Sequence, residues 1–199
     1  VGVIAERQMM ALSSDGFLYV TGTFQNTNKD ITLIKYNTSG DTIWTRIYRD
    51  TLIGDNYATA IAIDHAGDVI ITGTASSGAT NADCITVKYD SSGKVLWSKL
   101  FDSGNNLWDD YGYKVVIDSN NVYIGGDFGL IKYDSLGNVL WSRVNSSFSQ
   151  LGGEGLNIRL DDNSNVIYTT RNDNNLVVKY SSNGLKLDSI NFSPKNYNI

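Results

Sequence analysis

The sequence contains few of the residues that carry common catalytic or metal chemistry. Among 199 residues there are one cysteine, Cys84, one histidine, His65, and one proline, Pro194. A single cysteine excludes an internal disulfide, and a single histidine provides no second imidazole for a metal or catalytic cluster. No apolar run approaches the ~20 residues that a helix needs to cross a bilayer, so we expect no membrane insertion.

Charge is sparse and on balance negative. Charged residues make up 19% of the chain, and the formal net charge is -5. An acidic chain repels phosphate backbones, so we expect no nucleic-acid partner. The hydrophobic fraction of 41% is typical of a folded soluble protein. Helical periodicity is absent, whereas short runs of Val, Ile, Tyr and Thr alternate with turn residues, which predicts an all-β fold.

A tandem repeat organises the whole chain. A Lys-Tyr pair recurs with spacings of 53, 44 and 47 residues, and a turn containing glycine follows each pair. The pairs are Lys35-Tyr36, Lys88-Tyr89, Lys132-Tyr133 and Lys179-Tyr180. Four residues beyond each glycine stand Trp44, Trp97, Trp141 and, breaking the pattern, Asp188. Five residues before each lysine stand Asp30, Asp83, Asp127 and Asn174.

Each repeat holds four short strand-like runs, for example 58–64, 68–74, 84–89 and 94–100. Four-stranded units of this period, stacked in tandem, predict a β-propeller with four antiparallel blades. We expect a single domain over residues 1–199, with blades at approximately 4–50, 51–103, 104–146 and 147–192.

The number of blades in the parent ring is open at this point. The four units would suit a complete four-bladed ring or a fragment of a larger propeller. The fourth unit lacks its tryptophan, and segment 196–199 is similar to segment 55–58, which precedes a new strand. Both features favour the fragment. The chain begins with Val1 and shows no leader-like segment, so we expect a processed or excerpted chain.

The repeat resembles the SBBP type of bacterial β-propeller repeat, and segment 64–97 carries nearly all of that pattern. The matching residues are Asp64, Gly67, Thr72-Gly73-Thr74, Asp83, Lys88-Tyr89-Asp90, Gly93 and Trp97. The resemblance implies a secreted or cell-surface bacterial protein. Segment 89–97 is more distantly similar to quinoprotein-type blades, but no cofactor-binding residues of that class match, so we expect no cofactor.

The loops at one end of the blades vary, whereas the turns at the other end are uniform. The loop between the second and third strands holds residues 24–29 in the first unit and 75–82 in the second, and in the third unit Gly126 runs directly into Asp127. A constant frame with variable loops on one face is typical of a binding face. The alternative is neutral drift, because surface loops tolerate insertions.

Trp108 is the one tryptophan outside the repeat register. It precedes Asp109, Asp110 and Tyr111 in the long loop that leads to the first strand of the third unit. We include Tyr57, just ahead of the first strand of the second unit, among the candidates. Such a cluster could stack on a sugar ring or anchor a protein partner. The alternative is that Trp108 covers a gap over a blade edge.

The repeated residues favour structural roles. Trp44, Trp97 and Trp141 are expected to pack between adjacent blades. The conserved register of Asp30, Asp83, Asp127 and Asn174 predicts a hydrogen bond to a neighbouring loop backbone. Asp64, Asp118 and Asp161 could form an acidic ring that holds calcium, but each precedes its own turn, which favours Asx turns and no metal site.

No catalytic constellation is evident. The sequence therefore favours a non-catalytic binding or scaffold module of a larger polypeptide or assembly, with a protein or glycan partner. The alternative is a glycan-active enzyme with an acidic site over the propeller axis, because glycoside hydrolysis uses paired carboxyl groups. Acidic side chains from different blades that converge on the loop face would favour that alternative.

Overall fold

The computed structural model describes residues 9–25, 27–49, 54–76, 81–104, 109–144, 156–169 and 176–191. Within these ranges the regular structure consists of sixteen β-strands, and no helix that could span a membrane is found there. The positions of Trp108 and Asn174 lie outside the described residues.

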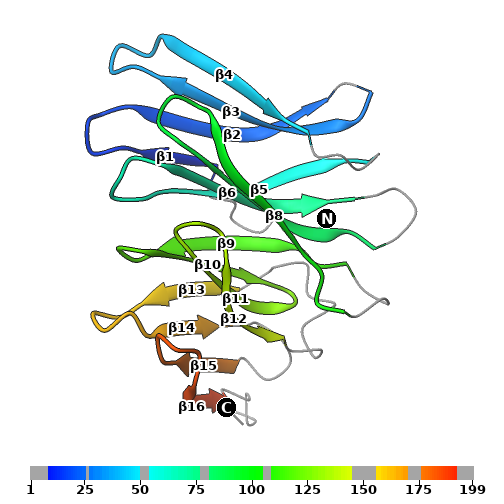
Figure 1. Ribbon diagram of the computed structural model, residues 1–199, viewed down its shortest axis with the longest axis vertical. Coiled ribbons are helices and arrows are strands. Elements are labelled where there is room, and N and C mark those ends of the chain that lie inside the picture. The colour runs from blue at the N-terminus through cyan, green and yellow to red at the C-terminus, as the bar shows by residue number, and fades with distance from the viewer. Residues whose placement is uncertain are drawn as a thin grey trace, which may run out of the picture.

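The strands form four separate antiparallel sheets of four (Figure 1), as the repeat predicts. The first holds β1 (Met10–Leu12), β2 (Leu18–Gln25), β3 (Lys29–Tyr36) and β4 (Thr42–Tyr48). The second holds β5 (Asn56–Ile63), β6 (Val69–Ala75), β7 (Asp83–Tyr89) and β8 (Val95–Phe101). The third holds β9 (Gly112–Ile117), β10 (Asn121–Gly126), β11 (Gly129–Asp134) and β12 (Val139–Val144). The fourth holds β13 (Asn157–Leu160), β14 (Val166–Thr169), β15 (Leu176–Tyr180) and β16 (Lys186–Asn191).

The repeated Lys-Tyr pair marks a β-bulge in every sheet. The register between the third and fourth strands shifts between the lysine and the tyrosine of the pair. In the first sheet Lys35 pairs with Trp44, whereas Tyr36 pairs with Thr42. A bulge bends and twists a strand locally, so the same bend enters each blade at the same place.

Three hydrophobic cores lie between consecutive sheets. In the first core Tyr19, Ile31 and Leu33 of the first sheet pack with Ile61 and Ile71 of the second. A second core joins the second and third sheets, and another joins the third and fourth. Each sheet therefore buries its apolar side chains against its neighbours. A sheet that lies between two others is covered on both of its faces, as in a propeller.

The first strands of the sheets form the inner row of the molecule. β5 contacts β1, and β9 contacts both β5 and β13. In Figure 1 the sheets follow one another from blue to red, with the first and the fourth at opposite ends. Among the described residues no extensive strand contact joins these two sheets, so the blades form an open series.

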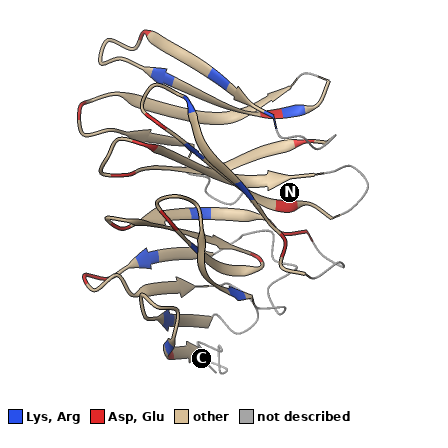
Figure 2. Ribbon diagram, in the orientation of Figure 1, with Lys and Arg blue, Asp and Glu red and all other residues tan. Residues whose placement is uncertain are grey.

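One end of the sheets carries the turns between first and second strands and those between third and fourth strands. We call this end the turn face. The opposite end, with the loops between second and third strands and between sheets, is the loop face. Figure 2 shows acidic residues at both ends, with the turn face on the left of the view. Their environments differ between the two faces.

Candidate functional site

The repeated carboxylates on the turn face accept hydrogen bonds from the backbone of their own turns. Asp64 Oδ1 accepts hydrogen bonds from the backbone N–H groups of Ala66 (2.9 Å) and Asp68 (3.0 Å). Asp118 and Asp161 bind the backbone of their own turns in the same way. These are the Asx turns that the sequence favours.

The second oxygens of these carboxylates have separate partners. Lys88 Nζ lies 2.8 Å from Asp64 Oδ2, and Lys179 Nζ lies 2.7 Å from Asp161 Oδ2. The hydroxyl of Tyr123 donates to Asp118 Oδ2 at 2.7 Å. Hydrogen bonds from Lys179 and Asn165 lower the pKa of Asp161 well below its usual range. Each carboxylate is therefore satisfied within its own blade rather than shared in a ring.

A half-open cleft of about 470 Å³ lies on the turn face, between the turns of the first two sheets and the end of β9. It contains the single histidine, His65, whose side chain is exposed, together with Asp15 and Asp64. Asp64 is already bound to its turn and to Lys88. Among the described residues that line it, the cleft thus brings together no base and orienting partner of the kind that nucleophilic catalysis uses.

On the loop face, the repeated aspartate has a different environment in each sheet. Asp30 is fully buried and accepts from Arg49, with Nε–Oδ1 at 3.0 Å and Nη2–Oδ2 at 2.6 Å. Asp127 accepts from the backbone N–H of Tyr111 at 2.7 Å, and burial raises its pKa to about 7. Asp127 thus makes the loop-backbone hydrogen bond expected at these positions, whereas Asp30 binds a side chain instead.

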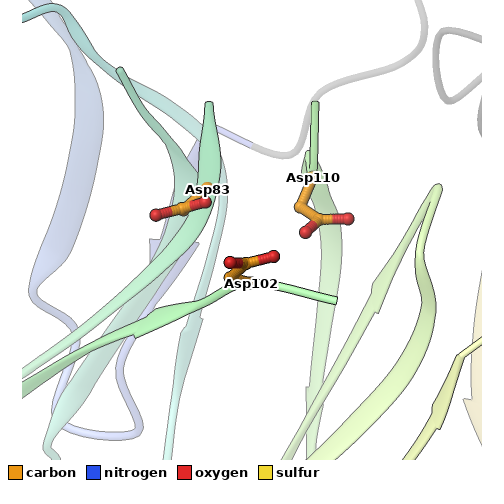
Figure 3. A group of neighbouring side chains, drawn as sticks. All are labelled: Asp83, Asp102 and Asp110. Atoms are coloured by element: carbon orange, nitrogen blue, oxygen red, sulfur yellow. The ribbon is translucent and has the colours of Figure 1, made fainter. Parts of the chain in front are cut away.

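Asp83, the equivalent residue of the second sheet, lies in a group of three carboxylates. One carboxylate oxygen from each of Asp83, Asp102 and Asp110 lies within 4.8 Å of the others (Figure 3). Asp83 begins β7, Asp102 follows β8, and Asp110 precedes β9. We call this group the acidic trio. Burial raises the pKa of Asp83 and of Asp110, and the neighbouring carboxylates raise both further.

The repeat register shows what is unusual about the acidic trio. Arg49 stands five residues after Trp44, and Asp102 stands five residues after Trp97. The arginine that neutralises Asp30 in the first sheet is thus replaced by an aspartate beside Asp83 in the second. Sequence reasoning missed Asp102, although aligning the first two units beyond the tryptophan would have revealed the change of charge.

The other candidates occupy a repeated contact between loops. Asp109 Oδ1 accepts from the backbone N–H of Ala82 at 2.7 Å, and its Oδ2 accepts from the hydroxyl of Tyr111 at 2.9 Å. Asp55 is bound in the same way, by the backbone N–H of Lys29 and by the hydroxyl of Tyr57, each at 2.9 Å. We call each such arrangement a loop clamp, because it ties the loop that enters one sheet to a loop of the preceding sheet.

The structure therefore brings Asp109 and Tyr111 together in one clamp and Tyr57 in the equivalent clamp of the preceding blade. Burial and the nearby Asp109 raise the pKa of Tyr111 to about 12, so this hydroxyl stays protonated. Asp110 belongs instead to the acidic trio, where Oδ2 accepts from the backbone N–H of Ser103 at 2.6 Å. The binding role of these residues stays a prediction.

The acidic trio combines the exposed Asp102 with the half-buried Asp83 and the buried Asp110. Carboxylate oxygens suit hard cations, but calcium takes six to eight of them, and three side chains fall short of that set. Two of the three residues flank the third and fourth strands of the second sheet. The trio therefore lies at the junction of the second and third sheets, where Asp110 stands just before β9 of the inner row.

No protein-family model matches this sequence, and no curated protein matches it. Membership of the SBBP family thus stays a prediction.

Solved structures support the propeller fold. A protein of unknown function from Bacteroides caccae matches with a TM-score of 0.54 at 14% identity, covering 96% of this chain and 69% of that one. The extracellular domain assigned to a hybrid two-component system from B. thetaiotaomicron matches with a TM-score of 0.54 at 16% identity, covering 95% and 23%. A gluconolactonase from Xanthomonas campestris matches with a TM-score of 0.51 at 11% identity, covering 93% and 61%.

At these identities the likeness shows the fold alone. The neighbours are propeller proteins, and this chain spans less than two thirds of the length of the second and third of them. Their different descriptions agree with the general rule that one fold serves many functions.

Proposed function

We propose that this chain is a non-catalytic propeller module of a secreted or cell-surface bacterial protein, and that it binds a protein partner through its loop face. One observation carries the proposal. The turn face repeats the same Asx turns in successive sheets, whereas equivalent loop-face positions carry an Arg–Asp pair in one blade and three carboxylates in another. A constant frame that varies its chemistry on one face is typical of repeat proteins that bind there.

The first sheet indicates which group would complement the acidic trio. At the equivalent position Asp30 is paired with the guanidinium of Arg49 through both of its oxygens. Arginine suits such sites because its planar fork binds carboxylates through two hydrogen bonds. We therefore expect the trio to receive an arginine side chain of a protein partner, next to the loop clamp of Asp109 and Tyr111.

The test uses a nona-arginine peptide as the probe, titrated by calorimetry at 150 mM NaCl. Asp102→Arg introduces at the trio the arginine that the first sheet already has, so we expect peptide affinity to fall at least tenfold. The matched control is Asp162→Arg, which makes the same change of charge at an exposed position of a turn-face turn. Equal losses in both variants would mean that overall charge alone attracts the peptide, and the proposed site would be wrong.

The enzymatic alternative rests on the same carboxylates, because acidic residues from two blades do converge on the loop face. Raised pKa values at Asp83 and Asp110 suit a general acid. We expect no hydrolysis when the protein is incubated with a panel of bacterial and plant polysaccharides and reducing ends are measured. Release of reducing ends that is lost in Asp110→Asn would instead establish the alternative.

A further inference from the structure

The glycine of the turn between the third and fourth strands meets the preceding sheet at each of the three internal junctions. Gly93, Gly137 and Gly184 are all buried. A methyl group placed on Gly137 would lie 2.8 Å from the Trp97 ring, and one on Gly184 would lie 2.8 Å from the Trp141 ring. The tryptophan of one blade therefore occupies the space directly above the glycine of the next.

Polar contacts accompany this packing and recur between blades. Trp97 Nε1 donates to the carbonyl of Ser135 at 3.0 Å, and Trp141 Nε1 donates to that of Ser182 at 3.0 Å. The cation two residues after the tryptophan binds the same turn. Arg46 Nε donates to the carbonyl of Gly93 at 3.1 Å, and Arg143 Nε donates to that of Gly184 at 2.6 Å.

Each internal junction thus joins a Trp-x-Arg or Trp-x-Lys strand to a glycine turn, which we call the acceptor turn. At the junction between the second and third sheets, Trp97 and Lys99 pack on Gly137. The contact depends on the absence of a side chain at the glycine and on carbonyl groups that point toward the incoming strand. The junction therefore requires a glycine in the turn and a Trp-x-Arg or Trp-x-Lys sequence in the strand that packs on it.

The first sheet has the same acceptor turn, but none of the residues that the structure describes occupies it. Gly40 has a φ of +87°, close to the +84° of Gly93, and Asn37 Oδ1 accepts from the backbone N–H groups of Ser39 and Asp41. Gly40 is nevertheless exposed, and within the described ranges no atom lies within 4 Å of a methyl group placed on it. This turn has the conformation of an acceptor without an incoming strand.

The apolar face beside this turn is uncovered in the same way. Ile71 and Val87 of the second sheet are fully buried against the first sheet. Their equivalents in the first sheet, Val20 and Ile34, are only half-buried. Leu12, at the edge of the same sheet, is 70% exposed.

We propose that this face of the first sheet is a docking surface for a further propeller blade that carries Trp-x-Arg or Trp-x-Lys on its outermost strand. The occupant is a blade outside this sequence. The chain uses its own three such strands internally, and its remaining tryptophan, Trp108, is followed by Asp109 and Asp110. A second copy fits poorly, because its fourth sheet presents Asp188 and Ile190 at the two positions.

The surface is the uncovered outer face of the first sheet together with its turn at Gly40, away from the loop face, so this inference is independent of the proposed function. Its test uses the chain itself as receptor and a triple variant as donor. Asp188→Trp and Ile190→Arg place the missing motif on β16, where both native side chains are exposed. Gly40→Asn blocks the donor's own acceptor turn, and asparagine tolerates positive φ better than most residues.

Wild-type chain and donor are mixed at equal concentration and analysed by sedimentation velocity. We expect a one-to-one complex with about twice the 21.9 kDa mass of the chain. The matched control is a Gly40→Asn receptor, which should lower the affinity for the same donor at least tenfold. Circular dichroism of each variant verifies that the β-fold is retained.

The proposal would be overturned if the folded donor fails to bind wild-type chain at concentrations up to about 100 µM. Self-association of the wild-type chain that Gly40→Asn abolishes would overturn it too, because the occupant would then be a second copy lacking the tryptophan. Binding that persists in the Gly40→Asn receptor would show that the acceptor turn is not the docking element.

Discussion

At the residue scale, the aspartates illustrate how position decides the state of a carboxyl group. Turn-face carboxylates accept several hydrogen bonds. The Ser92 hydroxyl and backbone N–H groups lower the pKa of Asp90, and the Asn138 side chain and backbone N–H groups lower that of Asp134. Asp127 on the loop face accepts one such bond at 2.7 Å yet is almost completely buried, so its pKa rises to about 7. Desolvation outweighs hydrogen bonding at Asp127, and the reverse holds in the turns.

This difference predicts how stability depends on pH. Unfolded aspartate has a pKa of about 3.9, so between pH 4 and 7 folded Asp127 holds a proton that the unfolded chain has lost. Stability then falls as pH rises through this range. We expect Asp127→Asn to flatten that fall and to raise the free energy of unfolding at pH 8 by about 1–3 kcal/mol. Urea titrations at pH 5, 6, 7 and 8 measure both effects.

Asp162→Asn is the matched control, because Asp162 is exposed in a turn and its neutralisation should leave the slope unchanged. An Asp127→Asn protein that loses stability with pH as steeply as wild type would show that Asp127 is ionised in the folded state across the range.

At the element scale, consecutive blades are joined by contacts between the fourth strand of one blade and the glycine turn of the next. Trp97 packs on Tyr133 with ring centroids 5.8 Å apart, and its Nε1 donates to Ser135. Three kinds of stabilisation therefore meet at one side chain: apolar burial, ring contact and a hydrogen bond to a backbone carbonyl. The bulge at Lys88-Tyr89 brings the tryptophan opposite Lys88.

We expect Trp97→Ala to lower the free energy of unfolding by about 3 kcal/mol, because it removes the ring packed over Gly137 and its hydrogen bond to the Ser135 carbonyl. Trp97→Phe retains most of the ring and should cost about 1–2 kcal/mol. Chemical denaturation of the two variants and wild type gives the three values. A loss below 0.5 kcal/mol in Trp97→Ala would contradict a packing role for the repeated tryptophan.

The elements themselves could be predicted from sequence, because the Lys-Tyr pair, the glycine turn and the tryptophan recur at constant offsets. The bulge could not, since only pairing with the neighbouring strand reveals a residue without a partner. Asp102 was missed for a similar reason. It has no repeated identity, and its meaning emerges only when Arg49 is seen bound to Asp30 in three dimensions.

Some residues of the loop clamps could be selected from the sequence, but the contacts that they make could not be predicted. Asp109, Tyr111 and Tyr57 were selected for their chemical type, whereas the structure shows two of the clamps built alike, from an aspartate and the tyrosine two residues later. A pattern of Asp-x-Tyr at the start of the first strand of a sheet or just before it was present in the sequence. Its partner, a backbone N–H of the preceding blade, depends on how consecutive blades pack and is invisible in the repeat.

At the scale of the whole molecule, the four sheets contribute to stability through their contacts with neighbours. In tandem-repeat proteins the stability is approximately a sum of repeat and interface contributions. The second and third sheets are covered on both sides, and β6 is buried along its whole length. The first and fourth sheets each have a single covered face among the described residues, so they have fewer interactions to resist local opening.

Local opening should therefore begin at the ends of the series. We expect amide hydrogen exchange to be slowest in β6 and β7 and at least tenfold faster in β2 and β15, since exchange from a strand reports the free energy of opening the unit that contains it. Mass-spectrometric exchange at pH 7 resolves the four sheets by peptide. Uniform protection across all four would mean that the chain opens as one cooperative unit.

The same measurement applies to the complex with the donor variant. Burying a free sheet face stabilises that sheet and its nearest neighbour before the rest of the series. If binding slows exchange in β2 and β3 but leaves β15 unchanged, the gain in stability therefore maps to the covered face.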